Sequence, residues 1–184
     1  MADQPTLQTE RLTLRPFAAE DGPRVRELAG DRKVAETTGL IPHPYPEGAA
    51  EEWIGTHGEL FEKTEAAVFA VTLTETGELV GAIGLVINEA CRSAEIGYWI
   101  GVPFWNRGYG TEAARELIRY GFDELDLHRV FAHHFSNNPA SGRIMEKIGM
   151  RYEGRMRDAF VKWDEFVDTV HYAILRTDLE DKES

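Results

Sequence analysis

The sequence has almost no cysteine and no long apolar run. Cys91 is the only cysteine in 184 residues, so an internal disulfide is excluded and a reducing, cytoplasmic setting is expected. No apolar run approaches the roughly 18 residues that a membrane-spanning helix needs. The N-terminal residues also lack the basic-then-apolar pattern of a signal peptide, so no membrane partner is expected.

Positive charge is also scarce. The chain has 20 Lys and Arg residues against 32 Asp and Glu residues, which gives a net charge of -12. Nucleic acids and anionic membranes both need a cationic protein surface, so neither is expected as a partner. Two interpretations of the acidic excess stay open: it attracts a cationic or amine-bearing substrate, or it serves only solubility or adaptation to a salty host.

The length and the pattern of apolar residues predict one α/β (α+β) domain over residues 1–184. Short apolar or alternating runs predict seven strands, at 11–17, 66–73, 78–87, 93–100, 128–135, 150–156 and 165–175. Apolar residues three and four apart predict about four helices, at 19–31, 47–63, 110–124 and 138–149. This order predicts a mixed, mostly antiparallel sheet with helices on both faces.

The stretch "WNRGYGTE" at 105–112 has the composition of an anion-binding loop. Gly108 and Gly110 let the backbone turn sharply, and successive N–H groups that point inward form an anion nest. A helix that begins at Gly110 or Thr111 adds its unpaired N–H groups and the positive end of its dipole. The stretch is therefore suited to a phosphate, although a simple connecting turn has the same composition.

Two common phosphate-binding motifs fit this stretch poorly. A P-loop has a lysine directly after its last glycine, whereas Thr111 follows Gly110 here. The dinucleotide fingerprint matches Gly108, Gly110 and Ala113, but its context is wrong. Residues 101–107 separate the preceding strand from the first glycine, and the next strand ends without an acid for a ribose. A nucleotide-dependent oxidoreductase remains a third-ranked alternative.

A family resemblance accounts for more of the chain. The runs "EIGYWIGVPFWNRGYGTEA" and "NNPASGRIMEKIGMRYEGRMRD", together with the opening "LQTERLTLRPF", resemble the GNAT acyltransferases. Within them they resemble the RimJ/RimL-type branch, which acetylates protein N-termini and other amines. The resemblance spans nearly the full length. It implies a sheet that is splayed between the fourth and fifth strands, acetyl-CoA as the cosubstrate, and no metal.

The resemblance also assigns the contacts with the cofactor. The nest would hold the pyrophosphate through Asn106, Arg107, Gly108, Tyr109, Gly110 and Thr111. The strand that ends in Tyr98, Trp99 and Ile100 would offer free backbone groups to the pantetheine arm, and one N–H there would polarise the thioester carbonyl. Asn138 is expected to cap a helix and also to contact the arm. Arg143 would reach the nucleotide phosphate, although Arg107 and Arg143 are equally consistent with solvated surface arginines.

Acetyl transfer to an amine requires a neutral amine and benefits from an acid at the leaving thiolate. Many members of the family place a tyrosine four residues before the glycine of "EKxG", but Met145 occupies that position here. Ser141, one turn earlier, is the candidate acid; a purely structural serine is the alternative. Glu95 is the candidate base, with a role in an arginine ion pair as the alternative. Weaker candidates for proton transfer are Glu89, His133 and His134.

The acceptor pocket is expected near the proline-rich loop 39–48 and the helix that follows it. His43, Tyr45 and Trp53 are the candidate acceptor contacts. The expected function is an acetyl-CoA-dependent N-acetyltransferase that acts on a primary amine, either a protein N-terminus such as that of a ribosomal protein, or a polyamine, amino sugar or amino acid. A non-catalytic acyl-CoA sensor is the alternative from another class. A homodimer is a further, open expectation.

Overall fold

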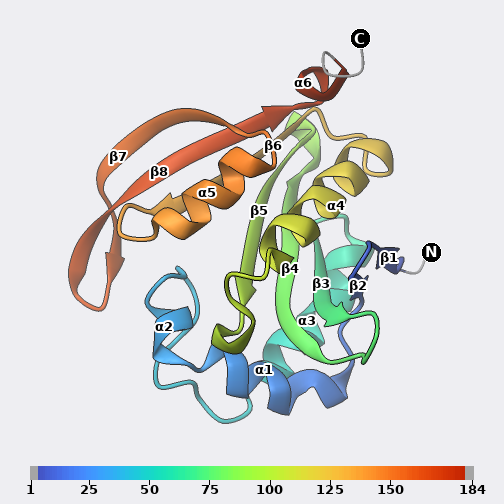
Figure 1. Ribbon diagram of the computed structural model, residues 1–184, viewed down its shortest axis with the longest axis vertical. Helices are drawn as coiled ribbons and strands as arrows, with labels where there is room; N and C mark the ends of the chain where they lie inside the picture. Colours follow the sequence, from blue (N-terminus) through green and yellow to red (C-terminus); the bar gives the residue numbers. More distant parts are fainter. Residues whose placement is uncertain (1–3, 181–184) are drawn as a thin grey trace.

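The computed structural model describes residues 4–180, which form a mixed sheet with helices on both faces (Figure 1). The sheet has the order β1-β2-β3-β4-β5-β6-β8-β7. Its strands are β1 (Leu7–Gln8), β2 (Leu12–Arg15), β3 (Ala66–Leu73), β4 (Leu79–Asn88), β5 (Ser93–Ile100), β6 (Arg129–Phe135), β7 (Arg151–Lys162) and β8 (Glu165–Leu175). The helices are α1 (Gly22–Ala29), α2 (Arg32–Ala35), α3 (Ala49–Glu62), α4 (Tyr109–Asp123), α5 (Pro139–Lys147) and α6 (Arg176–Glu180).

The predicted count of seven strands is wrong, because residues 4–180 contain eight. The extra strand β1 has two residues, and it pairs Leu7 with Leu14 and Gln8 with Thr13. Two residues are too few to show a period of two, so the pattern could not reveal this strand. The four longer helices were all predicted, and the four-residue α2 and five-residue α6 were not.

Side-chain alternation in the central strands explains the two helical layers. Phe69 of β3 packs edge-on against Tyr120 of α4, with ring centroids 5.9 Å apart. Its strand neighbours point to the other face, which α1 and α3 cover. Strand β3 and the first half of β4 are therefore mostly buried, whereas β4 becomes exposed toward its end, at Val86 and Asn88. No helix among residues 4–180 is long and apolar enough to cross a membrane.

The sheet splits between β5 and β6, which were the predicted fourth and fifth strands. The two strands are parallel and pair at only three positions, of which Glu95 opposite Phe131 is the last. Beyond Glu95, β5 stays paired with β4 as far as Ile100, while β6 continues with β8. The edge of β5 from Ile96 to Ile100 therefore faces a gap, as the family resemblance implied.

Candidate active site

The predicted anion nest lies at the start of α4. Asn106 and Gly108 both have left-handed backbone, with φ of 61° and 83°, and Gly108 is the N-cap of the helix. The helix begins at Tyr109, so the N–H groups of its first turn have no partner inside the helix. Gly110 packs closely, because a Cβ there would lie 3.1 Å from Cδ1 of Ile144. Both glycines thus have a conformational or steric reason to be glycine.

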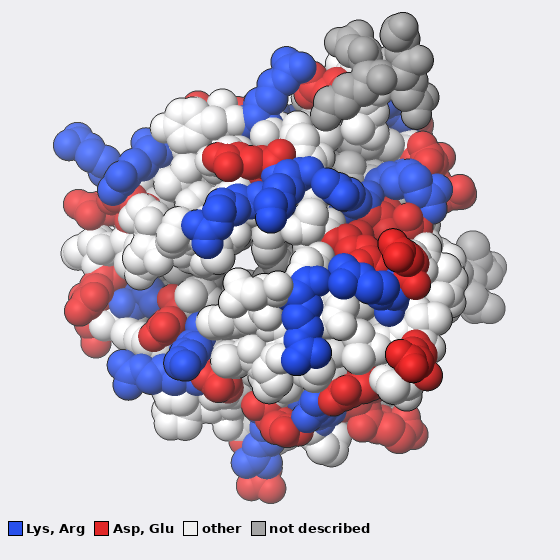
Figure 2. Space-filling view, viewed as in Figure 1, with Lys and Arg blue, Asp and Glu red and all other residues white. Residues whose placement is uncertain are grey.

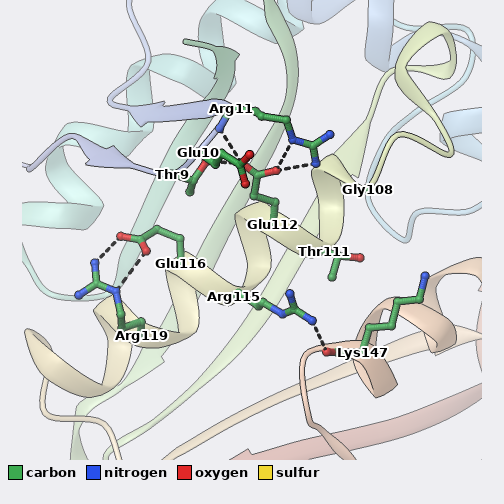
Figure 3. Close-up of a pocket in the computed structure, with 10 residues that line it drawn as sticks. All are labelled: Thr9, Glu10, Arg11, Gly108, Thr111, Glu112, Arg115, Glu116, Arg119 and Lys147. Carbon is green, nitrogen blue, oxygen red and sulfur yellow. Dashed lines mark hydrogen bonds and ion pairs between the residues drawn. The ribbon is translucent and has the colours of Figure 1, made fainter.

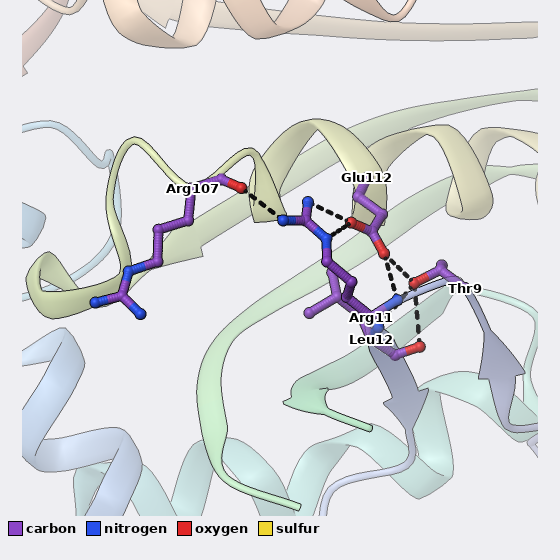
Figure 4. A network of polar contacts seen from close by, with 5 residues as sticks. All are labelled: Thr9, Arg11, Leu12, Arg107 and Glu112. Atoms are coloured by element: carbon purple, nitrogen blue, oxygen red, sulfur yellow. Dashed lines mark hydrogen bonds and ion pairs between the residues drawn. The ribbon is translucent and has the colours of Figure 1, made fainter. Parts of the chain in front are cut away.

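A charged network braces the nest from outside. Glu112 in the first turn of α4 accepts hydrogen bonds from the Thr9 hydroxyl at 2.6 Å and from the Arg11 N–H at 2.8 Å. It also pairs with the Arg11 guanidinium at 2.6 Å. Arg11 in turn donates to the carbonyl of Arg107 at 3.0 Å (Figure 4). The network therefore fixes the loop backbone to the N-terminal strands. Burial acts to raise the pKa of the Glu112 carboxyl, but the hydrogen bonds from Thr9 and Arg11 together lower it.

Two further contacts fix the elements around the nest: one holds the loop and the other joins α4 to α5. The indole N–H of Trp105 donates to the carbonyl of Ile100 at 2.6 Å, which ties the loop to the end of β5. On the opposite side, Arg115 of α4 donates to the carbonyl of Lys147 at the end of α5 (2.9 Å; Figure 3). The two helices that flank the nest are thereby held at a fixed separation.

A cavity of about 990 Å³ runs from the nest through the gap between β5 and β6. At the nest end it is lined by Asn106, Gly108, Tyr109, Gly110, Thr111, Asn138, Arg143 and Lys147. Figure 2 shows basic side chains gathered around a hollow on the face that carries α4 and α5, although the whole chain is acidic. This end of the cavity is thus suited to anionic phosphates.

The predicted cofactor residues are brought together with one exception. Tyr98, Trp99 and Ile100 line the cavity, as do Asn138 and Arg143. The guanidinium of Arg107 lies over the ring of Phe104, 5.8 Å from its centroid, and Arg107 is absent from the described cavity lining. The Arg107 side chain is therefore not part of the cavity lining, and the Arg107 carbonyl is held by Arg11. Lys147, which sequence reasoning did not select, lines the cavity beside Arg143 because the two are one helical turn apart.

Ser141 does not stand alone at the start of α5. Its Oγ lies 2.8 Å from the hydroxyl oxygen of Tyr98 on β5, and its N–H donates to Oδ1 of the N-cap Asn138 at 3.4 Å. Burial raises the pKa of Tyr98 to about 12, so its hydroxyl stays protonated at neutral pH. Met145, one turn further along α5, is 1% exposed and packs in the core. A tyrosine hydroxyl is therefore present after all, supplied by a strand instead of the helix.

Glu95 is paired with a histidine rather than an arginine. Its Oε1 lies 2.6 Å from Nδ1 of His133 on β6, so Nδ1 carries the hydrogen of this bond. The hydrogen bond from His133 lowers the pKa of the Glu95 carboxyl, which stays ionised at neutral pH. The His133 ring stacks on that of His171 from β8, with centroids 5.4 Å apart, and His171 Nε2 lies 2.8 Å from the Thr169 hydroxyl. Burial lowers the pKa of His171.

The two polar pairs lie on opposite sides of β5. Glu95 and Trp99 have one parity along the strand, whereas Tyr98 has the other and faces α5. A molecule that enters through the gap between β5 and β6 therefore meets the Glu95–His133 pair on one side and the Tyr98–Ser141 pair on the other. This arrangement places an ionised carboxylate with its imidazole on one side of β5 and a pair of hydroxyls on the other.

The predicted acceptor residues are only partly brought to the cavity. Tyr45 and Trp53 line it, and burial raises the pKa of the Tyr45 hydroxyl. His43 is exposed; its Nδ1 lies 3.2 Å from the carbonyl oxygen of Gly30, and it is absent from the described lining. Sequence reasoning missed Phe160, which lines the cavity from the extended part of β7. The polar residues around it hid this contact, because β7 is mostly exposed.

Residues at the tip of the β7–β8 hairpin hold the loop before α3. The ammonium of Lys162 donates to the carbonyls of Thr38 at 2.8 Å and Ile41 at 3.2 Å. Trp163 packs near His43, with ring centroids 6.1 Å apart, and under the guanidinium of Arg32 at 5.2 Å. Lys162 is 9% exposed, and this burial lowers its pKa. We call the contact between Lys162 and the carbonyls of the 38–41 loop the hairpin clasp.

The anion nest, the free edge of β5 and the two polar pairs together define a class of enzyme that binds a long, phosphate-bearing thioester. The nest and Arg143 match a pyrophosphate, the free edge of β5 matches a chain of amides, and the paired polar groups lie where the chain would end. Acetyl-CoA has these parts in this order. The sequence profile of the acetyltransferase (GNAT) domain matches residues 11–151, and the chain belongs to that family. GNAT enzymes use acetyl-CoA as the acetyl donor.

Individual relatives agree with this placement. The chain is 34% identical to the uncharacterized N-acetyltransferase YnaD of Bacillus subtilis, over 92% of this chain and 96% of YnaD. A GNAT-family acetyltransferase structure from Bacillus anthracis superposes with a TM-score of 0.82 at 31% identity, covering 93% and 98% of the two chains. The uS5-alanine N-acetyltransferase of Escherichia coli is 25% identical over 94% of this chain and 91% of its own length. The predicted RimJ/RimL-type branch is confirmed.

More distant structures share the fold. RimL, a ribosomal L7/L12 N-terminal acetyltransferase in complex with coenzyme A, has a TM-score of 0.86 at 17% identity, covering 93% and 98% of the chains. The spermidine N-acetyltransferase of Vibrio cholerae, in complex with CoA and spermine, has a TM-score of 0.79 at 23% identity, covering 92% and 98%. These two proteins act on different amines, so the shared fold leaves the acceptor open.

Proposed function

We propose that this protein transfers the acetyl group of acetyl-CoA to a primary amine, with Glu95 and Ser141 in its acid-base machinery. The observation that supports this most directly is the continuous cavity that joins the anion nest to the Glu95–His133 and Tyr98–Ser141 pairs. Acetyl-CoA supplies an activated thioester, and the protein residues orient it and manage the protons.

The Glu95–His133 pair is the proposed base. An amine must lose a proton before or during attack on the thioester. Because Glu95 is ionised and holds the Nδ1 hydrogen of His133, the other ring nitrogen of His133 is free to accept a proton from the amine. Glu95 thus acts directly, or through the imidazole that it orients.

The Tyr98–Ser141 pair is the proposed partner of the leaving sulfur. A phenol with a pKa of about 12 does not give up its proton to a thiolate whose conjugate acid has a pKa of about 8.5. The pair therefore stabilises the developing negative charge by hydrogen bonding, with Ser141 nearest the sulfur and Tyr98 polarising it. The backbone N–H of Ile100 is the proposed donor to the thioester oxygen, because the register of β4 and β5 directs the Trp99 N–H at β4 and the Ile100 N–H at the gap.

The experiment that tests this function is a turnover screen. Purified protein and acetyl-CoA are mixed with amines and N-terminal peptides, and the release of the free CoA thiol is recorded. Glu95→Gln and Ser141→Ala are assayed in parallel, and acetyl-CoA binding is measured by calorimetry. Turnover that both substitutions reduce while the cofactor still binds is the expected result. Tight binding without turnover on every amine would instead identify an acyl-CoA sensor.

The acceptor amine and the assembly are also proposals. A relative that acetylates a ribosomal protein supports a protein N-terminus, whereas the spermidine enzyme supports a small amine. A cytoplasmic location and a homodimer remain expectations from the sequence. They can be checked by cell fractionation and by light scattering of the purified protein.

A further inference from the structure

The half of the cavity on the Glu95 side of β5 has the lining of an apolar pocket. We call it the acceptor chamber, and its large side chains are Ile41, Tyr45, Trp53, Trp99, Phe135 and Phe160. Phe135 and Phe160 pack against each other with ring centroids 5.0 Å apart. Five of these six side chains are aromatic. A ligand body that gains from burial here is therefore apolar and flat.

The chamber has few groups that could bind a second positive charge. Among the residues of the described chain that line the cavity, Glu95 is the single carboxylate, and His133 already occupies one of its oxygens. A polyamine carries further ammonium groups, and each would lose its hydration without a carboxylate to replace it. The acidic excess of the chain thus lies outside this chamber, which supports its interpretation as a surface property.

The hairpin clasp limits access from one side. The Lys162 ammonium bonds to the carbonyls of Thr38 and Ile41, and a Cβ on Gly39 would lie only 3.3 Å from Cζ of Phe160. The loop and the hairpin are thus in van der Waals contact, and together they form one wall of the chamber. This closure favours a compact acceptor over the N-terminus of a folded protein.

We propose that the acceptor is a small monoamine whose single ammonium group lies at Glu95 and whose aromatic or similarly apolar body fills the chamber beside Phe160. This inference rests on the proposed function and narrows it to one substrate class. The proposed acceptor has one positive charge and one apolar body, and it is small enough to fit in the chamber while the hairpin clasp is closed.

The test compares three acceptors in the turnover assay. We expect kcat/KM for 2-phenylethylamine to exceed that for spermidine, and that for a peptide with an N-terminal alanine, by roughly tenfold or more. Equal or better use of spermidine or of the peptide would overturn the substrate class and leave the proposed acetyltransferase function intact. Lack of turnover on all three amines, with acetyl-CoA bound, would count against both.

A matched pair of variants locates the effect. Phe160→Ala removes an aromatic wall of the chamber and should raise KM for 2-phenylethylamine by roughly tenfold while KM for acetyl-CoA stays unchanged. Phe166→Ala is the control, because Phe166 is on the same hairpin, is 70% exposed and is absent from the described cavity lining. An unchanged amine KM in Phe160→Ala, or an equal change in Phe166→Ala, would contradict the proposed position of the apolar body.

Discussion

The hydroxyl oxygens of Tyr98 and Ser141 lie 2.8 Å apart, although the two residues come from β5 and α5. Many enzymes of this family carry a tyrosine at the position of Met145, and that methionine is buried here. The strand supplies the phenol instead and directs it at the first turn of α5. The methionine therefore does not leave this part of the cavity without hydroxyls, because Tyr98 and Ser141 both line it.

Removal of either hydroxyl should slow the reaction. We expect Ser141→Ala to lower kcat by roughly tenfold to a hundredfold, because a hydrogen bond to developing charge is lost. Tyr98→Phe should lower kcat less, since it acts through Ser141. The double variant should resemble Ser141→Ala, because the two hydroxyls act as a unit. Steady-state kinetics give the measurement, and fully additive losses would show that the hydroxyls act independently.

The Glu95–His133 pair should determine the acid limb of the pH profile. Glu95→Gln removes the carboxylate that holds His133 and should lower kcat by roughly a hundredfold. The groups that face His133 are Glu95 from β5 and His171 from β8, with Glu153 of β7 acting on His171. Because these groups are coupled, the acid limb of the pH profile reports the titration of the whole cluster and not of one residue.

The direction in which the acid limb moves in Glu95→Gln follows from the lowered pKa of Glu95. The folded pKa of Glu95 is lowered, so the carboxylate is present at neutral pH and is lost only as the pH falls through that lowered value. The acid limb in wild type should thus reflect protonation of the coupled cluster, and in Glu95→Gln it should move to lower pH, because the Glu95 carboxylate opposes the lowering of the His171 pKa. His171→Gln is the control for a general change in the cluster. An unmoved limb in Glu95→Gln would remove the pair from the mechanism.

Local sequence patterns predicted most of the helices and strands, but few of the side-chain pairs in the candidate site. The N-cap Asn138 of α5 and the left-handed Gly149 that follows the C-cap could be predicted, because backbone geometry restricts the residue types there. Glu95 could be selected from its strand, but its partner His133 lies on a strand that joins it only in the folded sheet. No local rule links residues across a splayed sheet. Side-chain direction also could not be foreseen at Arg107, whose neighbour Phe104 attracts the guanidinium.

The bracing network should control acetyl-CoA affinity without touching the ligand. Glu112→Gln weakens the contacts to Arg11 that hold the carbonyl of Arg107, so we expect acetyl-CoA to bind several-fold more weakly by calorimetry. Glu116→Gln is the matched control, because Glu116 pairs with Arg119 on the same helix, one turn beyond the nest. A similar loss of affinity in both variants would show an effect on α4 as a whole.

Gly108 should tolerate a side chain poorly for a conformational reason. Its φ of 83° is in the left-handed region, where an alanine costs about 1 kcal/mol or more. Space is adequate, because a Cβ would meet only Arg11 Nη2, at 3.4 Å. Gly108→Ala should therefore weaken acetyl-CoA binding by distorting the nest. Gly108→Asn is the informative comparison, since asparagine adopts this conformation more readily, and its affinity should lie between those of wild type and Gly108→Ala.

The hairpin clasp should act on the acceptor and not on the cofactor. Lys162→Met keeps most of the side-chain volume but removes the hydrogen bonds to the carbonyls of Thr38 and Ile41. We expect KM for the amine to rise several-fold while KM for acetyl-CoA stays constant, because the loosened loop lines only the acceptor chamber. Lys63→Met is the control, as Lys63 is exposed, directly follows α3 and, among residues 4–180, forms an ion pair with Glu59 of that helix. A change in both KM values would show a wider loss of structure.

His57 should make the fold sensitive to acid. It is 6% exposed, neither ring nitrogen has a hydrogen-bond partner among the described residues, and it packs against Phe17 and Trp53. Burial lowers the pKa of His57 from 6.5 to about 4, so the unfolded chain takes up a proton more readily than the folded one. Stability from this residue is complete above pH 6.5 and is lost as the pH falls toward 4, by about 3 kcal/mol.

Urea unfolding at pH 7 and pH 4.5 measures this effect against a matched pair of variants. His57→Leu removes the group that must stay neutral, so its stability should fall less between the two pH values than that of wild type. His128→Leu, at an exposed position, should behave like wild type. The same fall in stability in wild type and His57→Leu would assign the acid sensitivity to other groups. The paired carboxylates, among them Glu112 and Asp21, are the alternatives, because their pKa values are lowered in the folded state.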